Sequence, residues 1–369
     1  MIILIAFTEH EVALHYIEKM KNILYLTNIE VPYRIRFFNE LAKHCNLTVF
    51  YERRNSSNRN SKWANAETKI YTTEYLDGIN IGNENAFSLH IISILRRKWD
   101  VVVIGCYNSI VQILAMAYLK LKNVPFIINL DGEPFIGNGI KAFVKKKILT
   151  GAEIYLTAGI KASKSLRKAI GNNHSIIPYY FSSLANKEIK KNTKINSKRE
   201  NFVLVVGQYF DYKGLDVAFK IACMDVSIRY KFVGMGQRTN LFIHDMGKIP
   251  NNVEIIPFLQ KKELDIEYQK CALMLLPTRK ECWGLVVNEA ASFGTPIVST
   301  WGSGAAIEFI SNKYSHFLAK PGDTETLYEC VHRCLESDNS LYSKYLRNIS
   351  KYYSIERNVD EHLKAFGII

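Results

Sequence analysis

Residues 279–300 read RKECWGLVVNEAASFGTPIVST and place two glutamates, Glu281 and Glu289, eight positions apart. The apolar run ALMLLP before this stretch predicts a buried strand, and the segment after it predicts a helix that begins near Gly284 and ends at Gly294. A strand followed by a loop and a helix is the repeating unit of a parallel sheet. We therefore expect Glu281 in a loop at the carboxyl edge of the sheet and Glu289 inside the following helix.

This arrangement suits a bound nucleotide. The backbone N–H groups of Gly284, Leu285 and Val286 would form an anion site fit for a diphosphate. Glu289 lies about 7.5 Å further along the helix axis, roughly the distance from a diphosphate to its ribose. Glu281 would face the sugar on the other side of the phosphates. The alternative is a solvated helix glutamate and a favourable charge in the first turn.

The remaining chain repeats the same alternation twice. Apolar strands separated by helices fill the first half, a polar segment lacking aromatic residues follows, and the pattern then restarts. This predicts an α/β protein with two doubly wound, Rossmann-like domains that face a central cleft. The expected parts are an acceptor-binding domain (1–186), a linker (187–201), a donor-binding domain (202–350) and a C-terminal helix (351–369) that crosses back to the first domain.

The first strand of the sheet is expected in NILYLT, and Met20 stands just before it. Residues 1–20 are therefore expected to be a helical extension, and the sequence leaves open whether Met1 or Met20 is the true start.

The composition and charge of the chain indicate which class of molecule it binds and in which cellular compartment it works. The formal net charge is +13, with most of the excess in residues 1–190, which favours a phosphate-bearing partner. The seven scattered cysteines form no metal-binding spacing, and no apolar run is long enough to span a bilayer. We expect a cytoplasmic protein. The basic amphipathic stretch IKAFVKKKIL would allow peripheral contact with an anionic inner membrane face, although it also fits an ordinary helix with a lysine-rich solvent side.

The donor-side motifs resemble those of glycosyltransferase family 4. The Glu-x7-Glu segment, the downstream GTPIVSTWGSGAAIEFI, VGQYFDYKG and FVGMG match that family over most of residues 200–325. The resemblance implies the GT-B fold and transfer of a hexose-type sugar from a nucleotide-diphosphate sugar to a hydroxyl of a glycan or lipid-linked acceptor. It further implies retention of configuration, surface polysaccharide biosynthesis, and no cofactor beyond the nucleotide-sugar co-substrate.

Site residues carried over from the resemblance fall into three groups. Lys213 and Glu281 are expected to support catalysis. The predicted donor-binding residues are Gly207, Gln208, Lys213, Arg279, Glu281, Gly284, Leu285 and Glu289, and the predicted acceptor-binding residues are Arg34, Arg36 and Asp131.

The chain departs from the family pattern at two of these positions. Gln208 replaces the family's arginine, so one phosphate cation is missing unless Arg279 or Arg238 supplies it. Asp131 stands where the family often has a histidine. The Asp-Gly-Glu triplet that begins at Asp131 mimics the metal-binding motif of GT-A enzymes, but the doubled α/β pattern disfavours that interpretation, and no metal is expected. Two other functions stay open: a GT-B-fold nucleotide-sugar epimerase and a non-enzymatic, basic nucleic-acid-binding protein.

Overall fold

The computed structural model describes residues 20–53, 68–76, 78–81, 85–105, 107–134, 139–194 and 198–369. The expected extension therefore lies outside the described residues, apart from Met20. No helix in the described part of the chain is long and apolar enough to cross a membrane.

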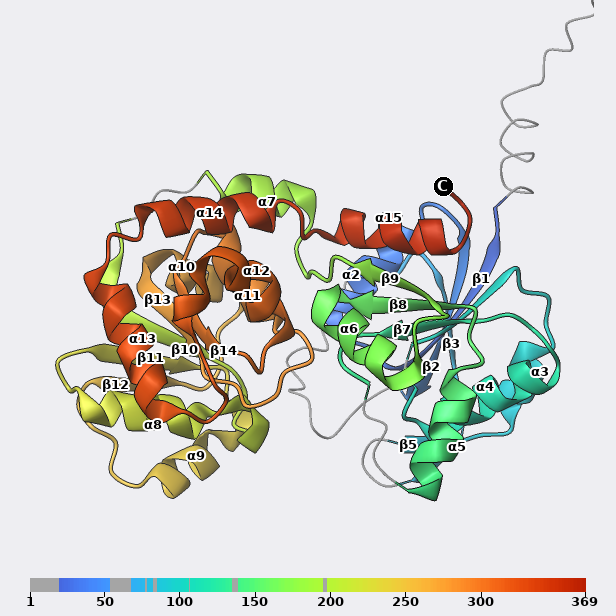
Figure 1. The fold of residues 1–369 in the computed structure, drawn as a ribbon, viewed down its shortest axis with the longest axis horizontal. Coiled ribbons are helices and arrows are strands. Elements are labelled where there is room, and N and C mark those ends of the chain that lie inside the picture. Colours follow the sequence, from blue (N-terminus) through green and yellow to red (C-terminus); the bar gives the residue numbers. More distant parts are fainter. Residues whose placement is uncertain are drawn as a thin grey trace, which may run out of the picture.

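The first sheet has seven parallel strands in the order β3-β2-β1-β6-β7-β8-β9 (Figure 1). Its central strands are short runs of buried apolar residues, as expected of a sheet covered on both faces. The strands are β1 (Asn22–Ile29), β2 (Asn46–Arg53), β3 (Thr72–Tyr75), β6 (Val101–Ile104), β7 (Ile127–Leu130), β8 (Ile154–Ala158) and β9 (Ser175–Tyr179). The helices are α2 (Pro32–Leu41), α3 (His90–Leu95), α4 (Ile110–Leu121), α5 (Ile140–Leu149) and α6 (Gly159–Ile170).

The second sheet has six parallel strands in the order β12-β11-β10-β13-β14-β15. Its strands are β10 (Glu200–Val206), β11 (Arg229–Val233), β12 (Val253–Ile256), β13 (Cys271–Leu276), β14 (Ile297–Thr300) and β15 (Leu318–Ala319). Its helices are α8 (Leu215–Met224), α9 (Thr239–Met246), α10 (Lys261–Lys270), α11 (Leu285–Ser292), α12 (Gly304–Tyr314), α13 (Thr324–Glu336) and α14 (Ser340–Ser350). The prediction of an α/β fold with two parallel sheets is confirmed.

Several local details differ from the sequence expectations. The segment expected as a linker contains the helix α7 (Asn186–Asn192), in which Glu188 accepts a bond from the N–H of Ala185 at the helix start. The last strand of the second sheet, β15, has only two residues, because residues 315–317 before it form a 3₁₀ turn. A short antiparallel hairpin, β4 (Ile79–Ile81) with β5 (Asn85–Phe87), was not anticipated.

The two sheet domains pack directly on each other. One continuous apolar core includes Tyr25 and Phe38 of the first domain together with Trp283 of the second. Trp283 is only 2% exposed, and its ring lies 6.0 Å from that of Phe181, which follows the last strand of the first sheet. The loop after β13 is therefore held between the domains.

The chain crosses between the domains twice, and the two crossings are bonded to each other. The first crossing follows β9, and the second leads from α14 into the final helix, α15 (Ile355–Ala365), which lies over the first domain (Figure 1). The N–H of Ile355 donates to the carbonyl of Leu184 at 2.9 Å. The N–H of Asn186 donates to both carboxylate oxygens of Glu356, at 3.0 and 2.9 Å.

His362 on α15 is buried against the first domain. Its Nδ1 lies 2.8 Å from the carbonyl of Asn358, its Nε2 lies 2.7 Å from the side-chain amide of Asn129, and the rings of Phe37 and Tyr179 pack around it. Burial lowers the pKa of His362 to about 4, and the charge of Arg34 acts in the same direction. The contact between α15 and the first domain thus contains a neutral histidine.

This histidine predicts a dependence of stability on pH. The pKa of His362 is lower in the folded chain than in the unfolded one, so between about pH 6.5 and pH 4 the unfolded chain binds more protons and stability falls as the pH falls. Acidification from pH 7 to pH 5 should cost about 2 kcal/mol through this group. Thermal melts across this range should show a shallower slope for His362→Gln than for wild type. The matched control, His44→Gln at an exposed position, should keep the wild-type slope; an unchanged slope in His362→Gln would contradict the assignment.

Candidate active site

Lys213 and Glu281 form an ion pair at the carboxyl edge of the second sheet. Lys213 ends a 3₁₀ turn after β10, and Glu281 lies in the loop between β13 and α11. The two loops are joined by the carbonyl of Tyr212, which accepts from the N–H groups of Arg279 (2.8 Å) and Lys280 (3.1 Å). The side chains of Lys213 and Glu281 keep 22% and 16% of their exposure, so the pair remains accessible to a ligand.

The loop that carries Glu281 ends at a helix N-terminus. Gly284 has a φ of +103°, a conformation that favours glycine, and it directly precedes α11. The N–H of Glu281 donates to the carbonyl of Gly302 at 3.0 Å, which fixes the loop against the segment after β14. The first-turn N–H groups of Leu285 and Val286 have no helical carbonyl to bond, so positive potential develops beside the ion pair.

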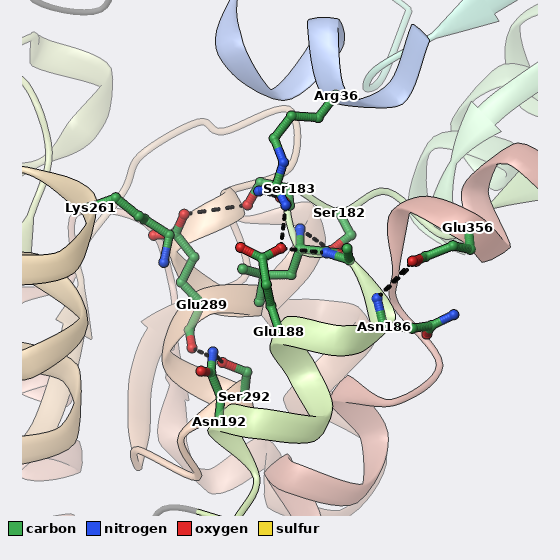
Figure 2. A network of polar contacts seen from close by, with 12 residues as sticks. Arg36, Ser182, Ser183, Asn186, Glu188, Asn192, Lys261, Glu289, Ser292 and Glu356 are labelled. Carbon is green, nitrogen blue, oxygen red and sulfur yellow. Dashed lines mark hydrogen bonds and ion pairs between the residues drawn. The ribbon is translucent and has the colours of Figure 1, made fainter. Parts of the chain in front are cut away.

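Glu289 lies in the second turn of α11 and is enclosed by residues from other segments. Its carboxylate accepts from the hydroxyl of Tyr268 on α10 at 3.0 Å. It also accepts from Ser183 in the first crossing at 3.3 Å (Figure 2). Lys261 at the start of α10 is drawn beside it in the same view. Burial raises the pKa of Glu289, while the charge of Lys261 and the bond from Tyr268 lower it. The Glu289 carboxylate thus lies between the second domain and the first crossing, where it is partly shielded from water.

The other predicted donor residues lie in the loops that follow β10 and β13 at this edge of the sheet. Gly207 follows β10 and packs against Gly234 after β11, and Gln208 comes next in the same loop. Arg279 is held by Asp216 through two bonds of 2.8 and 2.7 Å, which also raise its pKa. Arg238 stacks over the ring of Phe210 at 4.0 Å. Each arginine considered as a substitute for the missing phosphate cation is therefore engaged elsewhere on the same loops.

Two of the predicted acceptor residues form a buried pair. Arg34 on α2 is 7% exposed and pairs with Asp131, which follows β7. Asp131 also accepts from Tyr179 at 2.8 Å and from Asn129 at 3.0 Å. The Asp131 side chain still keeps 28% of its exposure, and through Asn129 it is linked to His362 on α15.

Arg36, the third predicted acceptor residue, joins three segments. It pairs with Glu188 on α7 and donates to the carbonyl of Ser183 at 2.6 Å (Figure 2). Ser183 in turn donates to Glu289. A continuous chain of polar contacts therefore runs from α2 of the first domain to the candidate ribose carboxylate of the second.

The loops of the two domains meet between Asp131 and Glu281. A Cβ added to Gly132 would lie only 2.6 Å from the Cβ of Cys282, so the two backbones approach as closely as glycine permits. The structure thus brings the predicted donor and acceptor loops to one place.

The two carboxylates of the Asp-Gly-Glu triplet form ion pairs with two different residues. Asp131 pairs with Arg34, and Glu133 pairs with Lys161 at 2.8 Å. Within the described ranges no group of three or more His, Cys, Asp or Glu side chains is arranged to hold a metal ion.

Sequence reasoning missed the residues that support Glu289 and close the domain contact. Ser183 and Tyr268 are ordinary residues in their local sequence, and only the fold places them around the carboxylate. Glu308, part of the glycine-rich downstream motif, accepts from the N–H of Ile160 at the start of α6 in the other domain. The sequence shows a glutamate after a glycine turn, but it does not show which residue of the other domain this glutamate contacts.

Comparisons with known proteins agree with this geometry. Residues 186–353 match the family model described as Glycosyl transferases group 1. An uncharacterized glycosyltransferase of Methanocaldococcus jannaschii is 26% identical over 66% of this chain and 68% of its own length. One from Haemophilus influenzae is 26% identical over 67% and 70%, respectively.

Solved structures show the same fold at low identity. Sucrose-phosphate synthase from Thermosynechococcus elongatus superposes with a TM-score of 0.70 at 14% identity, covering 94% of this chain and 98% of that one. Anabaena HepE in complex with UDP gives 0.71 at 12% identity, covering 94% and 100%. Residues 186–353 therefore match a group 1 glycosyl transferase domain, and the chain as a whole has the GT-B fold.

Proposed function

We propose that the protein transfers a hexose-type sugar, with retention of configuration, from a nucleotide-diphosphate sugar to a hydroxyl of a glycan or lipid-linked glycan. The observation that carries this proposal is the accessible Lys213–Glu281 pair beside the N-terminus of α11. Solved structures of the same fold support the donor class: Anabaena HepE was crystallised with UDP-glucose, and an E. coli trehalose-6-phosphate protein with UDP-2-fluoro glucose.

The reaction breaks the bond between the anomeric carbon and the donor phosphate oxygen and forms a bond from that carbon to the acceptor oxygen. Negative charge develops on the leaving diphosphate, and Lys213 with the first-turn N–H groups of α11 would stabilise it. The acceptor proton passes to the departing phosphate oxygen. Glu281 orients Lys213 and faces the donor sugar, and no protein nucleophile is required in this scheme.

Glu289 would bind the ribose hydroxyls, since its carboxylate lies further along the same helix. Gly207, Gln208, Gly284 and Leu285 would shape the phosphate cradle. Arg279 would act by holding the loop through Asp216 rather than by reaching the phosphates directly.

On the acceptor side, the closest approach of the two domains favours the loop after β7. Asp131, held by Arg34 and Tyr179, would orient the acceptor hydroxyls beside Cys282 and the donor sugar. Arg36 would position the crossing segment rather than bind a phosphate, because Glu188 and Ser183 already engage it.

We further propose surface polysaccharide biosynthesis at the cytoplasmic face of the inner membrane. Phe143 on α5 is 67% exposed, and Lys146 and Lys147 on the same helix are exposed. An apolar ring beside lysines suits an anionic lipid surface.

The experiment that tests the proposed function combines binding and turnover. A thermal-shift screen across nucleotide-sugars should reveal the donor, because a ligand at 100 times its Kd adds about 2.7 kcal/mol of stability. Release of nucleoside diphosphate that depends on an added glycan acceptor would support transfer. Conversion of the donor sugar without an acceptor would instead favour the epimerase, and stabilisation by oligonucleotides alone would favour nucleic-acid binding.

Turnover is expected to continue without divalent metal. Lys213 and the α11 N-terminus provide positive potential at the diphosphate. Initial rates in excess EDTA should stay within about twofold of the rates in Mg²⁺. A change of 1.4 kcal/mol in the activation free energy would instead alter the rate roughly tenfold. Complete loss of turnover, restored by Mn²⁺ or Mg²⁺, would return Asp131 and Glu133 to consideration as metal ligands.

Glu289→Gln should stabilise the ligand-free protein and weaken donor binding. The pKa of Glu289 is raised in the folded chain, so ionisation above that pKa costs folding stability, and the neutral amide avoids this cost. The melting temperature at pH 7.5 should rise by about 2 °C, while affinity for the nucleoside diphosphate measured by calorimetry should fall about tenfold. Glu263→Gln, at an exposed position on α10, is the control. Unchanged affinity in Glu289→Gln would refute the ribose role.

A further inference from the structure

A second pocket with an unusual charge lies on the second domain, away from the Lys213–Glu281 pair. It has a volume of about 540 Å³ and lies between the C-terminal ends of α7 and α14. Its lining contains five cationic side chains, two neutral polar ones and no carboxylate: Lys190, Thr193, Lys194, Lys344, Arg347, Asn348 and Lys351. We refer to these seven residues as the α7–α14 pocket.

Four of the five cations of this pocket have no carboxylate partner among the described residues. Among the described residues no ion pair includes Lys190, Lys194 or Lys344, and the Nζ of Lys351 donates to the neutral amide of Asn348 at 3.1 Å. The two helix ends contribute a negative potential of about half an elementary charge each. That is much less than the charge of these four lysines, so the pocket keeps a strong positive potential.

A further cation lies behind the pocket. Arg199 donates to the carbonyls of Cys271 (3.0 Å) and Phe293 (3.2 Å). Burial lowers the pKa of Arg199, and the charge of Arg347 lowers it further. Repulsion between these two arginines would be relieved by an anion in the pocket.

The α7–α14 pocket also lies where the chain crosses between the domains. α7 directly follows the first crossing, and α14 directly precedes the second (Figure 1). The crossings are bonded to each other through Ile355 and Leu184 and through Asn186 and Glu356. A ligand that contacts both helices would therefore join the two connections on which the relative position of the domains depends.

We propose that the α7–α14 pocket binds a multiply charged phosphate compound, either a free oligophosphate or a phosphorylated lipid headgroup, and thereby fixes the two crossings together. The lysines supply flexible point charges from both helices, which suits clustered phosphates better than a single planar carboxylate. The volume is that of a small-molecule site. This site is separate from the donor phosphate site and does not depend on the proposed transfer reaction.

The test measures binding of inorganic tripolyphosphate by calorimetry at low and moderate salt. The triple variant Lys190→Gln, Lys194→Gln, Lys344→Gln should lose at least tenfold in affinity with an unchanged circular dichroism spectrum. The matched triple variant Lys98→Gln, Lys168→Gln, Lys248→Gln removes the same charge from exposed positions outside the pocket and should change affinity less than twofold. Lys213→Ala should retain the binding, which separates this pocket from the donor site.

Two further readouts identify the source and the consequence. Sedimentation with phosphatidylglycerol vesicles distinguishes the sources: loss of both ligands in the pocket variant supports a shared headgroup site, and loss of tripolyphosphate alone supports a free oligophosphate. Hydrogen exchange of residues 181–186 and 351–355 should slow on addition of tripolyphosphate in wild type but not in the pocket variant. Equal binding by both triple variants, or binding abolished by Lys213→Ala, would overturn the proposal.

Discussion

Lys213→Ala is expected to lower kcat/KM for sugar transfer by about two to three orders of magnitude. Loss of one preorganised charge at a developing oxyanion has an effect of this size, and Lys213 is the cation that the loop after β10 holds beside the α11 N-terminus. Initial-rate kinetics with saturating acceptor measure this loss. The control Lys220→Ala removes an exposed lysine from α8. It should leave kcat/KM within about twofold of wild type, whereas a loss of 1.4 kcal/mol in transition-state stabilisation would lower it roughly tenfold.

A structural role for Lys213 can be separated from a catalytic one. The substitution leaves the Glu281 carboxylate, 16% exposed, without its cation, and some stability should be lost as a result. The double variant Lys213→Ala, Glu281→Gln removes that uncompensated charge and should recover the melting temperature without recovering turnover. Recovery of turnover together with stability would show that Lys213 only supports the loop.

The elements around this pair could be predicted closely because their signals are local. The helix expected between Gly284 and Gly294 is α11. Glycine at each end and apolar residues at helical spacing define such a helix without reference to the rest of the fold. The strand expected in ALMLLP before this helix corresponds to β13.

The partners of the site residues could not be predicted, because they come from distant segments. Arg34 and Arg36 were expected to bind the acceptor, and the structure pairs them with Asp131 and Glu188. Arg279 was considered as a phosphate cation, yet Asp216 binds its guanidinium with two hydrogen bonds. A sequence shows that an arginine lies in a loop, whereas the choice between ligand and protein carboxylate depends on which segments the fold brings within reach.

The polar contacts around Glu289 suggest why the donor site and the crossing are built together. Ser183 bonds to Glu289 with its side chain and to Arg36 with its carbonyl, and Ser292 on the same helix accepts from Asn192 on α7 (Figure 2). A ribose that competes for the Glu289 carboxylate would change the contact with Ser183. In the proposed function, donor binding and the connection between the domains would therefore share Ser183.

Gly214→Ala is expected to destabilise the second domain by about 3 kcal/mol or more. Gly214 has a φ of +68°, which costs an L-residue roughly 1–2 kcal/mol. A Cβ there would lie 2.1 Å from the carbonyl oxygen of Pro277, which is a backbone atom at the end of β13 and has little freedom to move. Urea or thermal unfolding followed by circular dichroism measures the loss.

Gly322→Ala separates the two contributions, because Gly322 lies in a turn with a positive φ, +82°, and has open space where the Cβ would stand. It should lose only the conformational part, roughly 1–2 kcal/mol, and it should keep full turnover. Gly214 also follows Lys213 directly, so a shift away from Pro277 would displace the lysine from Glu281 and lower kcat as well. Equal destabilisation by the two substitutions would mean that the loops after β10 and β13 can separate at little cost. The close contact between these loops would then not be what holds the ion pair in position.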